Sequence, residues 1–304
     1  MTSTSATDRD CAPSFQQHQC YLTGDWLAYA DVRISTDDLG FRQGVTAVER
    51  LRTYRGHPFQ VDAHLNRWQQ TVDSLQIDDL PDQSAISQLL VELIDRNFSW
   101  INCEGEVGVT IFATPGVGGE SLPTFCLHLN RLDHKQNARR RQQGQPLVVT
   151  DVQQPNQNCW PRSIKVRSRI HYYLADTRAK QSSKDAVGVL VDADGSVTET
   201  SIANLAITRG GQIISPPSDS VLGGITQMFV ESLAAEQGID WHKGTISPEQ
   251  LHQAEEILLM GTDGGVWFAN SIDGQSIGTG MSGEIYAVLR NAFDQATVGK
   301  RSNF

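Results

Sequence analysis

The chain has 304 residues, of which 39% are hydrophobic, and this length predicts one large or two modest globular domains. Its formal net charge is −10 and its pI is about 5.2. This balance argues against a nucleic-acid or anionic-membrane surface, because both surfaces need clustered positive charge. No stretch approaches ~18 consecutive apolar residues, so we expect no membrane-spanning helix.

The cysteine content and the first 18 residues indicate the cellular compartment of the protein. Five cysteines are present without a C-x-x-C pair, so neither a disulfide framework nor a zinc site is predicted. The eight histidines show no metal-ligand spacing, and no metal is expected. A reducing compartment fits best, and we expect a cytoplasmic protein. Residues 1–18 are rich in Ser, Thr and Gln and lack the apolar core of a signal peptide, so they are predicted to form a disordered tail.

Residues 19–133 predict a small domain of strands and helices. The expected elements are a hairpin over residues 20–28, a strand over 45–54, helices over 62–75 and 84–98, and strands over 106–113 and 125–129. In the first helix, apolar side chains recur at spacings of 3, 4 and 3 residues. We expect Asp62 to cap this helix.

Residues 134–146 interrupt this pattern. They are polar and contain the run Arg139, Arg140 and Arg141. We interpret the segment as a solvated linker between two domains, because charge runs usually face water. The alternative is a loop that closes over an acidic substrate.

Residues 147–304 predict a larger second domain. The expected elements are a helical segment after Lys165, a buried strand over residues 187–191, strands over 205–208 and just after 211, a helix ending near 235, a buried strand over 256–260 and a terminal helix over 282–296. No internal repeat is present.

The most specific motif begins at Lys165. It consists of Lys165, Leu174, Ala175, Ala179 and the sequence V-T-E-x-x-x-x-N from Val197 to Asn204. This set resembles the class IV (fold type IV) pyridoxal-phosphate enzymes, which include branched-chain and D-amino-acid aminotransferases and aminodeoxychorismate lyase. The resemblance runs from about residue 20 to about residue 296. It implies a mixed α/β (α+β) fold, with a small N-terminal α/β domain and a larger, β-rich, pseudobarrel-like C-terminal domain that binds the cofactor.

The resemblance also implies roles for individual residues. Lys165 would form the Schiff base with pyridoxal 5′-phosphate, and it could do so because burial disfavours the charged amine. Glu199 would hold a proton on the pyridine nitrogen, which makes the ring an electron sink. Arg67, in the sequence H-L-N-R, would grip the cofactor phosphate. The remaining positions that match cofactor contacts are Leu222 on the ring, Ile225 and Thr226 at a glycine-preceded helix start, and Thr262 and Asp263 after a strand.

Some positions depart from the family pattern. Val45 and Thr46 replace the usual Asp-Gly, Val48 replaces an aromatic residue that often faces the substrate, and Gln227 replaces an arginine. The predicted strand over residues 106–113 has no arginine or tyrosine for a substrate carboxylate. The residues that bind the substrate are therefore not identified by the sequence.

The resemblance implies an aminotransferase that works by a ping-pong mechanism. An amino acid, branched-chain-like or of the D series, would give its amino group to a 2-keto acid, with Lys165 moving the proton. Two alternatives stay open: a lyase of the aminodeoxychorismate lyase type, and a catalytically weak homologue that binds the cofactor. By the same resemblance we expect a homodimer.

Overall fold

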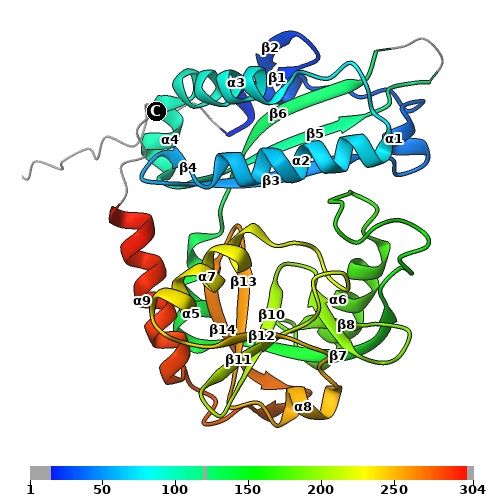
Figure 1. Ribbon diagram of the computed structural model, residues 1–304. Coiled ribbons are helices and arrows are strands. Elements are labelled where there is room, and N and C mark those ends of the chain that lie inside the picture. The colour runs from blue at the N-terminus through cyan, green and yellow to red at the C-terminus, as the bar shows by residue number, and fades with distance from the viewer. Residues whose placement is uncertain (1–14, 119–121, 300–304) are drawn as a thin grey trace, which may run out of the picture.

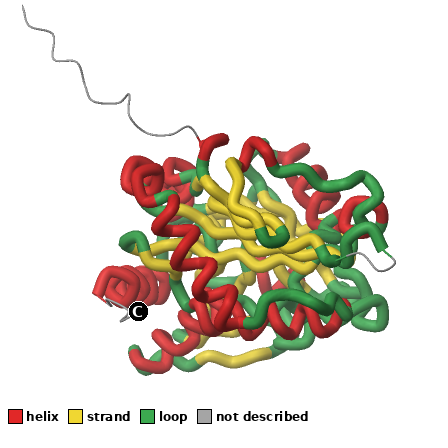
Figure 2. Tube along the Cα trace, turned by 90° about the horizontal axis from the view of Figure 1, so that it is seen from above, coloured by secondary structure: helices red, strands yellow, loops and turns green. Residues whose placement is uncertain are grey.

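Two β-sheets, one in each half of the chain, organise the molecule, and helices lie against both (Figure 1). The computed structural model describes residues 15–118 and 122–299. Seen from above, the strands occupy the centre and helices surround them (Figure 2). The mixed α/β fold expected from the sequence is confirmed. No helix in the described part of the chain is long and apolar enough to cross a bilayer.

The first half forms a six-stranded antiparallel sheet in the order β2-β1-β6-β5-β3-β4. Its elements are η1 (Phe15–Gln17), β1 (Gln19–Leu22), β2 (Asp25–Ala28), η2 (Tyr29–Asp31), α1 (Leu39–Arg42), β3 (Ala47–Tyr54), β4 (His57–Pro58), α2 (Val61–Leu75), α3 (Gln83–Arg96), α4 (Phe98–Glu104), β5 (Val107–Thr114) and β6 (Thr124–Arg131). Apolar side chains of α2 and α3 pack on this sheet, and Trp68, Leu51 and Ile111 are buried in the core between them.

The second half forms a nine-stranded sheet in the order β12-β11-β10-β13-β14-β7-β8-β9, with β15 paired to β14. Its elements are α5 (His134–Gln143), β7 (Gln145–Gln153), α6 (Ile170–Ser182), β8 (Val187–Val191), β9 (Val197–Thr200), β10 (Asn204–Arg209), β11 (Gln212–Ser215), α7 (Ile225–Glu236), β12 (Trp241–Lys243), α8 (Pro248–His252), β13 (Glu256–Gly261), β14 (Gly265–Ile272), β15 (Gln275–Ser276) and α9 (Glu284–Gly299). The sheet is mixed, because β7 pairs in parallel with both β8 and β14.

Side chains of strand β3 contact both halves of the molecule. They can do so because successive side chains of a strand point to opposite faces. Glu49 contacts α2 through His64 and Arg67. On the other face, Arg50 reaches Asp263 of the second half. This two-sided burial explains why nearly every residue of β3 is shielded from water.

The helix predicted over residues 62–75 is confirmed, but its cap is not Asp62. Helix α2 begins at Val61, and Gln60 is the N-cap, with a left-handed φ of 53° and no side-chain capping hydrogen bond. Asp62 lies inside the first turn. The negative charge of Asp62 there still interacts favourably with the helix dipole. The predicted N-cap therefore lies two residues after the observed one, Gln60.

The segment expected to be a linker, residues 134–146, is helix α5 followed by the start of β7. The Asp133 side chain caps α5 by accepting a hydrogen bond of 2.8 Å from the backbone N of Gln136. The guanidinium of Arg140 lies 5.7 Å from the ring centre of Trp267 on β14. Composition suggested a linker because most side chains of this helix are polar, yet one face packs on the second sheet.

Part of the segment expected to be a disordered tail, residues 15–18, is folded against the first sheet. Residues 1–14 lie outside the described residues. Phe15 begins η1 and packs against the core of the first sheet, with its ring centre 5.5 Å from that of Trp100. His18, in the same segment, is buried and stacks on Tyr29 and Trp100, so two ring-bearing side chains anchor residues 15–18 to the core.

Candidate active site

A pocket between the two halves collects side chains from distant parts of the sequence. Seven of the eight predicted site residues line it: Arg67, Lys165, Glu199, Leu222, Ile225, Thr226 and Thr262. They come from α2, the segment before α6, β9, the loop before α7, the start of α7 and the turn after β13. The two sheets must therefore pack together before the site exists.

Lys165 is positioned by the first half of the chain, although it lies in the second. Its backbone O accepts a hydrogen bond of 2.9 Å from the backbone N of Val48, and its backbone N donates to Thr71 Oγ1 at 3.1 Å. Burial, with the positive charge of Arg67 nearby, lowers the pKa of Lys165 to about 8. Roughly one tenth of such an amine is neutral at pH 7, far more than of an ordinary lysine.

Glu199 is buried and surrounded by hydrogen-bond donors. Its Oε1 accepts from Tyr172 at 2.5 Å and from Gln154 at 3.1 Å. Its Oε2 accepts from Asn204 Nδ2 at 3.0 Å and from the backbone N of Leu222 at 3.3 Å. Burial raises the pKa of Glu199, while the bonds from Tyr172 and Leu222 oppose that rise. These donors hold the carboxylate in one orientation.

Arg67 forms a buried ion pair that the sequence did not predict. Its Nε and Nη2 donate to the two carboxylate oxygens of Glu49 at 2.9 and 2.6 Å, and its Nη1 donates to the backbone O of Gly223 at 2.7 Å. His64 also contacts Glu49, at 2.9 Å. Although burial opposes ionisation, Arg67 and His64 hold the pKa of Glu49 well below its usual range. Three of the five guanidinium N–H groups are used, so two remain for an anion.

Helix α7 begins at the pocket with its first N–H groups uncapped. Gly224 is its N-cap residue and offers no side chain, and the first N–H groups of a helix have no partner inside it. With the helix dipole, these groups form an anion-binding site beside Thr226 and Thr262. Gln227, which stands where the family has arginine, donates to Glu231 at 2.9 Å and adds no charge to this site.

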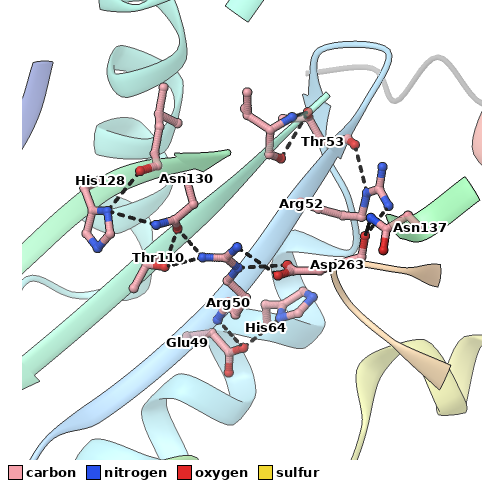
Figure 3. A network of polar contacts seen from close by, with 12 residues as sticks. Glu49, Arg50, Arg52, Thr53, His64, Thr110, His128, Asn130, Asn137 and Asp263 are labelled. Carbon is pink, nitrogen blue, oxygen red and sulfur yellow. Dashed lines mark hydrogen bonds and ion pairs between the residues drawn. The ribbon is translucent and has the colours of Figure 1, made fainter. Parts of the chain in front are cut away.

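Asp263, the eighth predicted residue, lies elsewhere. Its carboxylate oxygens each accept a hydrogen bond of 2.9 Å from Arg50 (Figure 3). Its backbone O accepts from Arg52 at 2.8 Å and from Asn137 at 2.9 Å (Figure 3). Asp263 therefore joins β3, α5 and the β13–β14 turn, and it lines a neighbouring cavity that also reaches Lys165.

Residues 46–272 match the family model for amino-transferase class IV. The match spans most of the chain, and the chain belongs to this family, whose members use pyridoxal phosphate. The pocket offers what that cofactor needs: an amine with a lowered pKa, an oriented carboxylate and an anion site at a helix start. Among the described residues, no group of three or more His, Cys, Asp or Glu is placed to hold a metal ion.

Two relatives illustrate the range of the family. The chain is 24% identical over 267 residues to branched-chain-amino-acid aminotransferase-like protein 1 of Arabidopsis thaliana, covering 87% of this chain and 48% of that protein. It thus spans about half the length of that plant protein. It is 23% identical over 288 residues to D-alanine aminotransferase of Bacillus licheniformis, covering 92% of this chain and 97% of the relative.

The fold is also that of solved branched-chain amino acid aminotransferases. The structure of the Thermobaculum terrenum protein in its PLP form superposes with a TM-score of 0.83, and the alignment covers 94% of this chain and 95% of that one at 18% identity. The Escherichia coli protein superposes with a TM-score of 0.83 at 18% identity, covering 95% of this chain and 98% of that one. These likenesses establish the fold type IV architecture.

Proposed function

We propose that this protein is a pyridoxal-phosphate-dependent aminotransferase that moves an amino group between an amino acid and a 2-keto acid, with Lys165 as its catalytic residue. The supporting observation is that Lys165, whose pKa is lowered to about 8, shares one pocket with Glu199 and the uncapped start of α7. Family membership supports the same conclusion.

In this proposal the cofactor, when bound, supplies an electron-withdrawing ring that accepts the electron pair left at the substrate Cα. Lys165 Nζ takes the proton from Cα and later returns one, and a lowered pKa suits both steps because the amine is partly neutral near pH 7. Glu199 holds the proton on the ring nitrogen. Tyr172 and Asn204 keep the Glu199 carboxylate in place for that task.

The phosphate group would bind at the start of α7. The backbone N–H groups of Ile225 and Thr226 and the hydroxyl groups of Thr226 and Thr262 are the donors available there. Arg67 would add positive charge through the two N–H groups that Glu49 and Gly223 leave free. Leu222 would supply an apolar contact to the ring.

We also propose that the protein is a cytoplasmic homodimer. The cysteines at positions 20, 103, 126 and 159 are free, which suits a reducing compartment. The dimer is expected from the family resemblance alone.

The decisive experiment is to incubate the purified protein with pyridoxal phosphate, reduce it with borohydride and map the labelled peptide. We expect the label on Lys165, and a Lys165→Ala preparation should lose it. Label on another lysine would overturn the assignment.

A donor screen with L- and D-amino acids then tests the reaction. Keto-acid production that requires an acceptor keto acid supports transamination, whereas product formed without any acceptor would indicate a lyase. Loading of the cofactor with no conversion of any donor would indicate a weak, cofactor-binding homologue.

A further inference from the structure

A nearly buried arginine lies in a loop that is mostly exposed. Residues 154–164 join β7 to Lys165 without forming a helix or strand. Pro161 and Ser163 are exposed, yet the side chain of Arg162 between them is only 6% exposed. A charged side chain is rarely withdrawn from water unless groups of the protein replace its hydrogen bonds. The groups that replace them show what Arg162 holds in place.

The guanidinium of Arg162 binds three separate segments. Its Nη1 and Nη2 donate to the two carboxylate oxygens of Asp192, at 2.8 and 2.9 Å. Nη1 also donates to the backbone O of Ser220 at 2.8 Å, and Nε donates to the backbone O of Pro155 at 3.4 Å. Four of the five N–H groups of the side chain are therefore satisfied. The Arg162 guanidinium, together with a hydrogen bond from the backbone N of Ala193, holds the pKa of Asp192 below its usual range.

Two of these segments lead directly to the pocket. Lys165 follows Arg162 by three residues, and Leu222 follows Ser220 by two. Both Lys165 and Leu222 line the pocket. The hydrogen bond from Arg162 to Ser220 therefore restrains the distance between the amine and the residue expected to contact the ring.

The third segment leads to the carboxylate of the site. Asp192 begins the turn between β8 and β9, and its backbone N donates to the backbone O of Ser196 at 2.7 Å. Glu199 lies on β9, three residues after Ser196. By holding Asp192, Arg162 restrains this turn relative to the segment that precedes Lys165.

The other arginine–carboxylate pairs are more exposed. Among the pairs that the described residues form, only those of Arg67 and Arg162 have an arginine side chain less than a tenth exposed. A second contact between the same two loops, from Gln157 Nε2 to the backbone O of Asp219 at 2.7 Å, is exposed to water. Water can replace such an exposed hydrogen bond, so Gln157 provides a matched control for Arg162.

We propose that Arg162 is a positioning residue, which holds the amine, the ring contact and the carboxylate of the site at the spacing that the cofactor needs before the cofactor binds. The proposal rests on the proposed function, since it concerns the same site. Without Arg162 the two loops could adopt more conformations, and cofactor binding would have to order them at a cost in conformational entropy. Lysine could not replace it, because an ammonium is a point charge, whereas the planar guanidinium reaches a carboxylate and two carbonyl groups together.

The first test needs no variant. Hydrogen exchange, followed by mass spectrometry of peptides, compares the cofactor-free protein with the protein loaded with pyridoxal phosphate. We expect the backbone N–H groups of Ile164, Ser220 and Leu222 to be protected already without cofactor, because each has a hydrogen-bond partner in the folded chain. Free exchange of these groups that ends only on loading would overturn the proposal.

The second test compares cofactor affinity. Arg162→Lys should weaken the binding of pyridoxal phosphate roughly ten- to a hundredfold, the range for lost charge-assisted hydrogen bonds, whereas Gln157→Ala should change it less than about twofold. Spectrophotometric titration of the cofactor-free proteins measures both affinities, and urea unfolding checks that each variant is folded. Unchanged affinity in Arg162→Lys, or an equal loss in Gln157→Ala, would overturn the inference.

The third test uses chemical rescue to separate positioning from loss of stability. Methylguanidinium added to Arg162→Ala should restore the affinity for pyridoxal phosphate at least about tenfold, and methylammonium should not, because only the guanidinium has a planar set of donors. Equal restoration by both ions would show that charge suffices and would contradict the proposal. Pyridoxal phosphate that labels Lys165 equally well with and without Arg162 would overturn this inference alone. Label on another lysine of the unmodified protein would overturn the proposed function instead.

Discussion

At the scale of single residues, Arg67 and Glu49 depend on each other because both are buried. Arg67→Ala would leave Glu49 as an uncompensated buried charge, with only His64 beside it. We expect the free energy of unfolding to fall by about 3–5 kcal/mol, measured by urea denaturation of the cofactor-free protein. The double variant Glu49→Gln/Arg67→Met should recover part of this loss. If Arg67→Ala unfolds like the unmodified protein, the ion pair contributes little to the fold.

Lys165 gives a prediction about pH. Burial lowers its pKa to about 8, so the reactive neutral amine should appear as the pH rises through about 8. Short pulses of pyridoxal phosphate followed by borohydride should label the cofactor-free protein with a midpoint near that pH. Subtracting the label on Lys165→Ala removes the contribution of other lysines. A midpoint at about 10.4, the ordinary lysine value, would mean that the amine is not desolvated.

A substitution at Glu199 distinguishes a role in the reaction from a role in cofactor binding. Glu199→Gln keeps the shape of the side chain but removes the negative charge that would stabilise a protonated ring. If this charge supplies ~3–4 kcal/mol in the transition state, turnover should fall on the order of 10²–10³-fold. Cofactor occupancy, measured in the same preparation, should be retained because the proposed phosphate site is the start of α7 and not Glu199. Full occupancy with a near-normal rate would exclude Glu199 as the partner of the ring nitrogen.

At the scale of elements, the start of α7 is fitted closely to β10. A Cβ atom at Gly224 would lie 1.8 Å from Oδ1 of Asn204, whereas one at Gly223 would meet nothing within 4 Å. Asn204 in turn donates to Glu199 and to the backbone O of Leu222, at 3.0 and 2.9 Å. This contact links the anion site to the carboxylate that faces the same pocket.

The two glycines make a matched pair for an experiment. Gly224→Ala should lower the free energy of unfolding by about 1–3 kcal/mol, because Asn204 must shift to make room. Gly223→Ala should change it by less than about 0.5 kcal/mol. Thermal or urea unfolding of the cofactor-free proteins measures both. Equal effects of the two substitutions would show that the approach to Asn204 is unimportant.

At the scale of the whole molecule, the site lies where the two sheets meet. Contacts across this junction include Arg50 and Arg52 with Asp263, and Arg67 with Gly223 (Figure 3 shows the first two). Neither half holds all of the predicted cofactor contacts. Arg67 belongs to the first half, and Lys165 and Glu199 to the second, so loss of this junction would disperse the site.

The oligomeric state is a prediction for the whole molecule. From the family resemblance we expect two copies of the 33.5 kDa chain to associate. Sedimentation velocity at micromolar concentration should show one species with about twice the chain mass. A fully active species at the mass of one chain, still active after dilution to nanomolar concentration, would contradict the dimer.

Much of the fold and cofactor site was predictable because the signals are local. The apolar run at residues 187–191 and the periodic pattern at 62–75 each report burial along one element, and both predictions are confirmed. Lys165, Glu199 and the start of α7 lie within motifs only a few residues long. The family motifs in the sequence therefore identified seven side chains that share the pocket, whereas the eighth, Asp263, lies outside it.

Only the tertiary structure decided how charges combine across the junction. Arg50, Arg140 and Arg167 lie on β3, on α5 and before α6, and nothing in their local sequence indicates that they meet in one cavity. The same holds for the pairing of Glu49 with Arg67 and for the position of Asp263 beside Arg50. Periodicity and composition report how one segment is buried. The partners of a charge depend on how two sheets pack, which is a property of the folded chain.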